Sequence, residues 1–364
     1  MTVLRASRVV TPGGMLGPTE IVVDDGLITV LARARGPVPE RTIVPGFVDL
    51  QVNGIDDVDV ARADGADWDR LDAMLVAQGT TTWCPTLVTA PPHHYPAALA
   101  RITAAASRTG VRPAIAGVHL EGPFLGGAPG AHTRSLVQPV DLSWLATLPP
   151  IVRLVTIGAE PEHALEAIRA LATSGVLVSV GHSTASIEQV TAAIDAGARL
   201  VTHLFNGMNA MHHRAPGVPG AALTDDRVAV SLIADGVHVH PAVLRLAFAA
   251  KPASLVVLVT DAVAWRSGTA GPVRIAIVDG APRLTDGTLA GSAATMDECI
   301  RQVVRASGVT LDRAVLAAST NPARLLGLHD RGALEVGRRG DLVELDDELR
   351  VRGTWIGGHC VHAA

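Results

Sequence analysis

The chain has 364 residues, of which 48% are hydrophobic and 18% charged, and its formal net charge is −5. A chain of this length can bury a large core and is too long for one small module. The weak acidic charge and the lack of any run of Lys or Arg argue against a nucleic-acid partner and against a membrane-surface site. No stretch of roughly 18 uninterrupted apolar residues is available for a membrane span.

The cysteine pattern bears on the cellular compartment. Cys84, Cys299 and Cys360 are odd in number and far apart, which fits neither a zinc knuckle nor the disulfide framework of a secreted protein. The first residues also lack the continuous apolar stretch of a signal peptide. We therefore expect a soluble protein in the reducing cytoplasm.

The two ends of the chain have similar sequence patterns. Residues 1–43 contain short strand-like runs broken by turns, and the runs Gly340–Leu345 and Val351–Val361 near the other end are similar. We expect the two ends to pair into one small β-sandwich domain, made of residues 1–43 and 331–364. A second domain, residues 44–330, is then inserted between them.

In this central part, apolar runs alternate with amphipathic helical stretches about every 30 residues, which is the rhythm of βα units. The expected strands are Ile43–Val52, Thr80–Val88, Ala114–Leu120, Val152–Ile157, Leu177–Gly181, Leu200–Leu204, Val228–Ile233 and Leu255–Val259. The expected helices include Trp68–Gln78, Glu162–Thr173, Ile187–Ala196 and Pro241–Ala250. Eight such units, with no G-x-G-x-x-G after an early strand, favour an α/β fold of the (β/α)8 TIM barrel type over an open Rossmann sheet.

Polar side chains follow one expected strand after another. Glu121, His182 and His203 end the third, fifth and sixth strands, and the carboxyl ends of barrel strands meet at one mouth. Imidazole nitrogen and carboxylate oxygen suit zinc and its neighbours, with one position left open for water in a catalytic site. A single histidine could instead be a hydrogen-bonded residue at the rim, but three such groups at one mouth need a common partner. We therefore predict that these three residues hold a metal.

Asp261 ends the eighth expected strand, in the run Val259–Ala262. A carboxylate at this place can take a proton from water and pass it to a leaving nitrogen. The alternative role is an N-cap for the segment that follows. The strand-end position favours the proton-transfer role.

These segments resemble the N-acetylglucosamine-6-phosphate deacetylases, within the amidohydrolase superfamily. The resembling segments are Pro45-Gly46-Phe47-Val48-Asp49, His119-Leu120-Glu121-Gly122-Pro123-Phe124, Gly181-His182-Ser183-Thr184-Ala185, Thr202-His203-Leu204-Phe205-Asn206, Val259-Thr260-Asp261-Ala262, Gly287-Thr288-Leu289-Ala290-Gly291-Ser292, Ser319-Thr320-Asn321-Pro322-Ala323 and Gly337-Arg338-Arg339-Gly340-Asp341-Leu342-Val343. They span nearly the whole chain in order, and H-L-E-G-P together with T-H-L-[FY]-N is highly specific. The resemblance implies the same metal ligands, and it implies that Asp261 is the proton shuttle.

The number of metals is set by the first strand end. Many members of the superfamily carry H-x-H there and bind a second metal, whereas this chain has Gln51-Val52-Asn53. Neutral amides are poor ligands for zinc, so we expect one divalent metal per chain, with Zn²⁺ favoured over Fe²⁺ or Mn²⁺. Lys251 is the only lysine, which leaves essentially no candidate for a carbamylated lysine that bridges two metals.

The resemblance also implies a set of substrate-binding residues. Asn206, Gly207 and His238 would bind the sugar phosphate, and His132 would contact a sugar hydroxyl or the acetyl carbonyl. Arg214 would reach the neighbouring site across the interface of a homodimer. The alternative for Arg214 is an exposed charge on a loop, which is the commoner fate of arginine.

Two segments depart from the family pattern. Trp265 and Arg266 stand where small residues are usual, and we expect them near the mouth of the site. The short stretch Gly126–Pro129 replaces a loop that contains lysine. His240, beside Pro241, is expected to cap a helix or to face solvent, and neighbouring His212 and His213 have no assigned role.

The resemblance thus implies an enzyme that converts N-acetylglucosamine-6-phosphate to glucosamine-6-phosphate and acetate. Metal-activated water would attack the acetyl carbonyl, with Asp261 as base and then acid. One alternative is a related amidohydrolase acting on N-acetylgalactosamine-6-phosphate or another N-acyl amine, which the Trp265–Arg266 departure favours modestly. The other is a non-catalytic sugar-phosphate sensor, for which a proton shuttle has no use.

Overall fold

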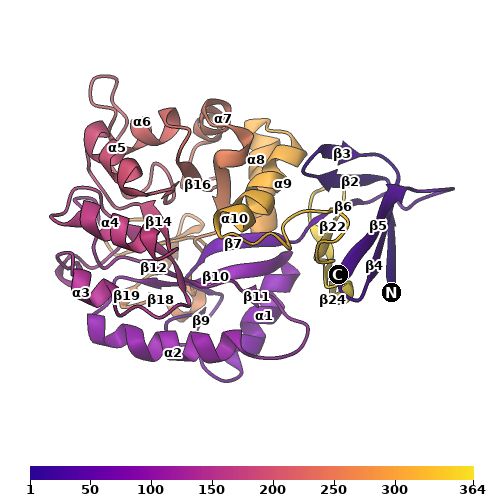
Figure 1. Cartoon of the computed structure of the whole chain (residues 1–364), viewed down its shortest axis with the longest axis horizontal. Coiled ribbons are helices and arrows are strands. Elements are labelled where there is room, and N and C mark those ends of the chain that lie inside the picture. The colour runs from indigo at the N-terminus through magenta and orange to yellow at the C-terminus, as the bar shows by residue number, and fades with distance from the viewer.

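The computed structural model describes residues 1–364 and shows a large barrel with smaller sheets at one end (Figure 1). Eight parallel strands, each paired with the next, form the barrel. They are β7 (Phe47–Val52), β10 (Thr80–Val88), β12 (Val118–Glu121), β13 (Val152–Ile157), β14 (Leu177–Val180), β15 (Leu200–Val201), β16 (Ala229–Ile233) and β17 (Val256–Val259). The last strand returns to the first through a bridge between Val52 and Ala262. The predicted (β/α)8 fold is confirmed.

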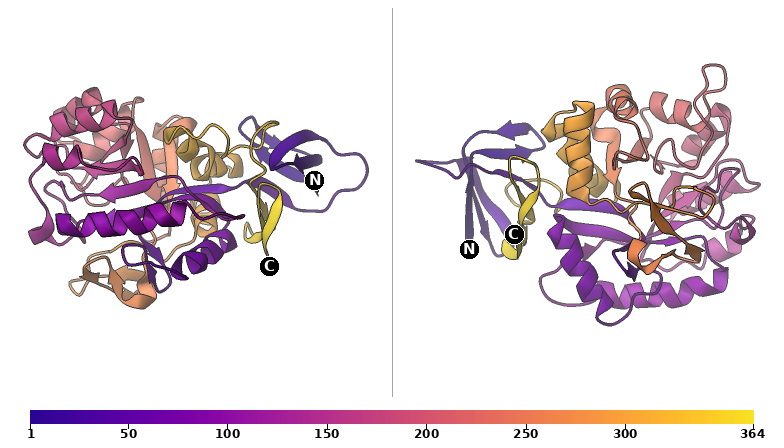
Figure 2. Two further views of the ribbon diagram at one scale, coloured as in Figure 1. Left: turned by 60° about the horizontal axis from the view of Figure 1, so that its bottom comes forward. Right: turned by 180° about the vertical axis from the view of Figure 1, so that it is seen from behind.

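Helices surround the strands in all three ribbon views (Figure 1 and Figure 2). They are α1 (Asp67–Ala77), α2 (Tyr95–Ala106), α3 (Leu142–Leu145), α4 (Ala164–Thr173), α5 (Ile187–Ala196), α6 (Gly217–Thr224), α7 (Pro241–Ala250), α8 (Met296–Ser307), α9 (Leu311–Ala318) and α10 (Thr320–Leu325). The predicted bounds of α5 and α7 are correct. For α5 the reason is local, because Ser186 and Gln189 form a capping box before it and Gly197 ends it.

The barrel strands are buried on both faces. Every residue of β16 and of β17 is buried, as expected for parallel strands with helices outside and side chains packed inside. The largest hydrophobic cluster has 65 buried residues and includes Phe47, Trp83 and Leu120. No helix in the structure has the length and apolar character needed to cross a membrane.

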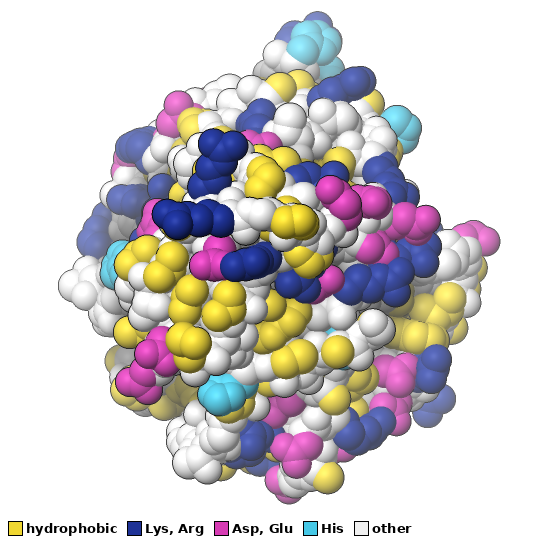
Figure 3. Space-filling model, turned by 90° about the vertical axis from the view of Figure 1, so that its right-hand side faces the viewer, with side chains coloured by type: hydrophobic (Ala, Val, Ile, Leu, Met, Phe, Trp, Pro, Cys, Tyr) yellow, Lys and Arg dark blue, Asp and Glu magenta, His cyan; other side chains and the backbone are white.

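Both chain ends build the small β-sandwich, as predicted. One sheet has three strands, β1 (Thr2–Ala6), β4 (Thr19–Asp24) and β5 (Leu27–Arg33). The other runs in the order β24 (His359–Ala363), β23 (Val351–Ile356), β22 (Leu342–Leu345), β6 (Thr42–Pro45), β2 (Arg8–Thr11) and β3 (Gly14–Leu16). Their shared core includes Ile21, Ile28, Ile43 and Leu342. Figure 3 faces this end and shows basic, acidic and hydrophobic side chains interspersed.

Three expected strands differ from the observed ones by more than one residue at an end. Ile43–Val52 is two strands, because β6 belongs to the sandwich and β7 to the barrel. Ala114–Leu120 is broken into β11 (Ala114–Ile115) and β12 around Gly117, whose φ is 148°. In place of Leu200–Leu204, β15 ends at Val201. The domain limits at residues 43 and 330 stay a prediction.

Short hairpins that the sequence analysis did not predict add to this framework. Strands β8 (Gly54–Ile55) and β9 (Val58–Asp59) follow β7. Four more follow β17, namely β18 (Thr269–Ala270), β19 (Val273–Arg274), β20 (Ala276–Val278) and β21 (Ala281–Arg283). Ala270 and Val273 of this second group line the pocket described below.

Candidate metal centre and substrate pocket

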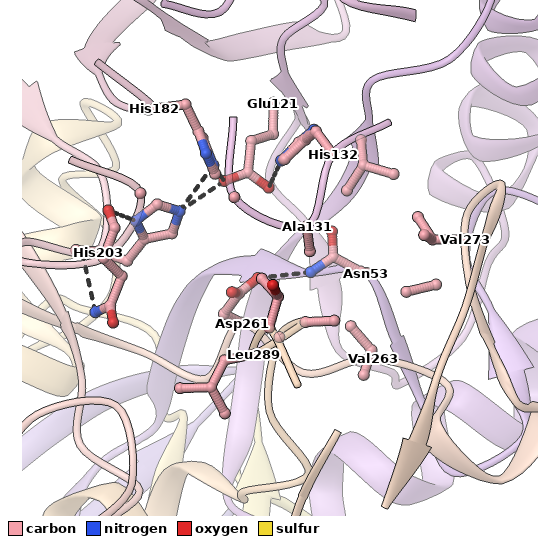
Figure 4. A pocket seen from close by; sticks show the side chains of 18 of the residues that line it. Asn53, Glu121, Ala131, His132, His182, His203, Asp261, Val263, Val273 and Leu289 are labelled. Atoms are coloured by element: carbon pink, nitrogen blue, oxygen red, sulfur yellow. Dashed lines mark hydrogen bonds and ion pairs between the residues drawn. The ribbon is translucent and has the colours of Figure 1, made fainter. Parts of the chain in front are cut away.

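A pocket opens among the segments that follow the carboxyl ends of the barrel strands (Figure 4). Eight of the nine predicted site residues line it, and the exception is Arg214. The eight are Glu121, His132, His182, His203, Asn206, Gly207, His238 and Asp261. The barrel therefore brings together residues that are up to 140 positions apart in sequence, from Glu121 to Asp261.

Glu121, His182 and His203 converge on one point in this pocket. Glu121 Oε1 lies 3.0 Å from His182 Nε2 and 2.9 Å from His203 Nε2, and the two Nε2 atoms are 3.1 Å apart. All three residues are buried. Burial opposes ionisation of Glu121, but the close contacts of its carboxylate with the His182 and His203 rings hold its pKa well below the usual range.

The tautomers of the two histidines follow from their outer partners. His182 Nδ1 donates to the Ala128 carbonyl at 3.3 Å, and His203 Nδ1 donates to the Asn206 carbonyl at 3.1 Å. Because a carbonyl oxygen can only accept, a neutral imidazole then carries its lone pair on Nε2. Two such lone pairs and a carboxylate oxygen about 3 Å apart repel one another unless a cation or a proton lies between them. Ligand atoms held at about 2.1 Å by one metal are separated by roughly 3.0–3.4 Å, so the trio fits a divalent ion.

His132 is a further nitrogen ligand candidate at the same place. Its Nε2 lies 3.8 Å from Glu121 Oε2, and the potential ligand atoms of Glu121, His132 and His182 are within 4.8 Å of one another. His132 Nδ1 contacts Thr89 Oγ1 at 2.9 Å. Burial, together with the neighbouring His182, lowers the pKa of His132 to about 3. The shorter distances from His203 favour His203 as the third ligand and leave His132 beside the metal position.

Three predicted site residues share an unusual backbone conformation. His182 (φ 49°), His203 (φ 31°) and Asp261 (φ 49°) all lie in the left-handed region, which is rare for residues other than glycine. Each is the second residue after the end of its strand, following β14, β15 and β17 respectively. Strained residues persist where the surrounding structure over-determines them, and they cluster at functional sites.

Asp261 lies beside the trio and is held by two amides of the first strand end. Asn53 Nδ2 donates to Asp261 Oδ1 at 2.7 Å, and Gln51 Nε2 donates to the same oxygen at 3.0 Å. Gln51 Nε2 also lies 3.0 Å from Glu121 Oε1. Burial and the nearby Glu121 carboxylate raise the pKa of Asp261 to about 7. These two amides therefore act as hydrogen-bond donors to carboxylates.

The predicted substrate residues lie on the wall next to the trio. His238 Nδ1 is 2.7 Å from Asp235 Oδ2, which fixes the ring and leaves Nε2 free for a ligand. Gly207 has φ 59°, and a Cβ there would stand 2.7 Å from His182 Nδ1, so only glycine fits. Asn206 also lines the pocket.

The predicted basic residue Arg214 does not reach this pocket. It is exposed, and its Nη1 lies 2.9 Å from His213 Nε2. No Arg or Lys lines the pocket at all. His240 caps α7, since its Nδ1 accepts from Ala242 N at 3.2 Å, which confirms the predicted capping role.

Trp265 and Arg266 lie near the pocket, as expected, because Trp265 packs against a cluster that includes the lining residue Ala270. Neither lines the pocket. Arg266 pairs with Asp56 at 2.8 Å and stacks on Trp265, which packs against a buried cluster that includes Val263 and Ala270. The pair therefore supports the pocket wall from behind.

An apolar wall faces the polar cluster and was missed by the sequence analysis. Figure 4 shows Val263 and Leu289 near Asp261 and Val273 farther off, beyond Asn53, with all three across the pocket from His182. Leu289 belongs to the segment Gly287–Ser292, which the family resemblance had included without a role. That motif was the available signal, whereas Val273 stands in a hairpin with no such signal.

Comparison with known proteins identifies the family. Residues 42–361 match the Amidohydrolase family model. N-acetylglucosamine-6-phosphate deacetylase of Homo sapiens is 39% identical over 386 residues, covering 99% of this chain and 92% of that protein. N-acetylgalactosamine-6-phosphate deacetylase of Escherichia coli O157:H7 is 37% identical, covering 98% of each.

Solved structures agree over the whole length. N-acetylglucosamine-6-phosphate deacetylase of Thermotoga maritima superposes with a TM-score of 0.92 at 30% identity, covering 100% of both chains. An Asp-to-Ala mutant of the Mycobacterium smegmatis enzyme, in complex with N-acetyl-D-glucosamine-6-phosphate, gives a TM-score of 0.92 at 35% identity, covering 99% of both. The fold, the pocket and these relatives place the chain in the amidohydrolase family of hydrolases.

Proposed function

We propose that this protein is a metal-dependent hydrolase that removes the acetyl group of N-acetylglucosamine-6-phosphate, yielding glucosamine-6-phosphate and acetate. The observation that carries the proposal is the buried trio of Glu121, His182 and His203 with Asp261 beside it. The human relative bears the name of this activity, and the M. smegmatis relative binds this sugar phosphate.

In this proposal Glu121, His182 and His203 hold one divalent ion, with Zn²⁺ favoured and Fe²⁺ or Mn²⁺ accepted by the same donors. When bound, the ion supplies Lewis acidity to the acyl carbonyl and lowers the pKa of water. Gln51 and Asn53 supply neutral amides in place of a second set of ligands, which supports a single metal per chain.

Asp261 transfers the proton. Its carboxylate takes a proton from the attacking water and returns it to the departing nitrogen. Asn53 and Gln51 hold Oδ1, which directs the second oxygen of Asp261 to the reacting atoms. His132 is neutral and hydrogen-bonds a sugar hydroxyl or the acyl oxygen.

The phosphate group binds at Asn206, the backbone of Gly207 and His238. A phosphate dianion also needs a strong cation, yet the pocket contains no Arg or Lys from its own chain. We propose that a second copy of the chain supplies Arg214 from its exposed loop, so that the active form is a homodimer.

The three free cysteines support a cytoplasmic location.

Acetate release from the two epimeric 6-phosphates tests the substrate. Release from N-acetylglucosamine-6-phosphate by wild type, lost in Asp261→Asn with metal still bound, is the expected result. Faster release from N-acetylgalactosamine-6-phosphate would favour the second candidate, whose support is the E. coli relative of that name. Binding of sugar phosphate without any acetate release would leave a non-catalytic sensor.

A further inference from the structure

A glycine-containing segment lies against the metal-ligand candidate His182. We call residues 126–130 the clasp loop. Gly126 N donates to the His182 carbonyl at 2.8 Å, and the Ala128 carbonyl accepts from His182 Nδ1 at 3.3 Å. The loop therefore holds both the main chain and the ring of His182. Its bond to Nδ1 decides that Nε2 faces Glu121.

Glu160, which follows β13, ties the clasp loop to the residues just after His182. Its Oε1 accepts from Gly127 N and from Thr184 N, each at 2.7 Å. Its Oε2 accepts from Ser183 Oγ. Thr184 Oγ1 also donates to Glu160 Oε1, at 3.2 Å, so uncharged donors surround this half-buried carboxylate. Burial would raise the pKa of Glu160, but the bonds from Gly127, Ser183 and Thr184 lower it.

The close approach of these segments depends on glycine. A Cβ on Gly126 would overlap the Glu160 carboxylate, and one on Gly127 would overlap Thr184 Oγ1. A Cβ on Gly158 would lie 2.5 Å from Gly126 N. These backbone segments can approach one another so closely only because glycine has no side chain. This close packing fixes the position of the clasp loop.

We propose that Glu160 is a positioning residue that fixes the orientation of His182 through the clasp loop. The inference rests on the proposed metal site. His182 is held in a left-handed conformation at φ 49°, and such a conformation persists only with support from its surroundings. Removing one hydrogen-bond partner of a metal-binding histidine typically weakens metal binding about 10–100-fold.

Metal affinity of the purified full chain tests the inference without using turnover. Zn²⁺ binding to demetallated protein is measured by competition with a chromophoric chelator, and the Co²⁺ absorption spectrum reports ligand geometry. The variants are Glu160→Ala, Glu160→Gln and the control Glu162→Ala, which removes a carboxylate that is 91% exposed two residues away. We expect Glu160→Ala to weaken Zn²⁺ binding about 10–100-fold and to change the Co²⁺ spectrum. Glu160→Gln keeps an oxygen for Gly127 N and Thr184 N and should restore most of the affinity, while Glu162→Ala should match wild type.

Wild-type affinity and an unchanged Co²⁺ spectrum in Glu160→Ala would overturn this inference alone. Absence of metal binding by the wild type would overturn the proposed metal site and this inference with it. If Glu160→Ala does not fold, Glu160→Met removes both acceptor oxygens with little change of volume. Unaltered Zn²⁺ affinity in Glu160→Met would likewise overturn the role of Glu160.

Discussion

Asn53 Nδ2 donates a 2.7 Å hydrogen bond to Asp261 Oδ1, joining the first strand end of the barrel to the last. The main chain repeats this connection, since Asn53 N donates to the Ala262 carbonyl at 2.8 Å. The proposed proton-transfer residue is therefore positioned by the same residue that helps to close the barrel.

Replacing Asn53 with alanine should lower kcat while leaving metal content near one per chain. The amide holds one oxygen of Asp261, and losing such an outer partner typically costs about 10–100-fold in activity. Steady-state kinetics with elemental analysis measures both quantities. Wild-type kcat in Asn53→Ala would show that Gln51 alone positions the carboxylate.

Removing the metal should destabilise the protein. Two histidine lone pairs and the Glu121 carboxylate face one another at about 3 Å, and a ligand that binds only the folded state stabilises it by about 4 kcal/mol at 1,000 times its Kd. We expect chelation to lower the melting temperature and added Zn²⁺ to restore it. In His203→Ala the same treatment should have a much smaller effect, and an equal shift in that variant would contradict the assignment of His203.

The buried carboxyl group of Asp49 should make the free energy of unfolding depend on pH. Burial raises its pKa to about 7 from an ordinary value of 3.8, so the folded state binds this proton more tightly than the unfolded state. The stabilisation from this group is complete below about pH 4 and is lost as pH rises through 7, with a slope of at most about 1.4 kcal/mol per pH unit.

The variant Asp49→Asn removes this titration and keeps an oxygen that accepts from Thr260 N and Gln51 N. Urea unfolding of both proteins between pH 4.5 and 8 measures the difference in unfolding free energy. We expect the variant to gain stability relative to wild type as pH rises. Parallel curves over this range would refute the assignment of the pH dependence to Asp49.

Arg214 should act on the neighbouring site. Arg214→Ala should raise KM for the phosphorylated sugar because no Arg or Lys of the same chain lines the pocket. Mixing inactive Asp261→Asn with Arg214→Ala should recover part of the activity, since a hybrid dimer holds one site with an intact Asp261 and a donated Arg214. Sedimentation as a monomer, or no recovery on mixing, would remove Arg214 from the site.

Much of the architecture follows from local sequence patterns. Continuous apolar runs such as Val256–Val259 predict strands buried on both faces, and polar residues directly after them predict the mouth of a barrel. That reasoning placed His182, His203 and Asp261 in one pocket, because strand ends of a closed barrel have a single place to converge.

What the sequence missed depends on contacts between loops. Glu160 follows a strand end like the others, but its role depends on Gly127 and Thr184, which no periodicity brings together. Trp265 was expected near the mouth because it is close to Asp261 in sequence, but the sequence does not show that it packs behind the pocket wall. The Ile43–Val52 run was read as one strand because hydrophobicity does not show that Pro45 belongs to one sheet and Phe47 to another.

His182, His203 and Asp261 each stand two positions after the last residue of their strand, so the same short segment places all three side chains. The strand end fixes where this two-residue segment begins, and the left-handed conformation sets the direction of the side chain. The distances among these side chains therefore do not depend on the length of the loops that follow. The loops that follow these three residues can therefore lengthen or shorten without changing those distances. A single residue inserted in such a segment, between Val259 and Asp261 for instance, would displace the Asp261 side chain from the proposed metal centre.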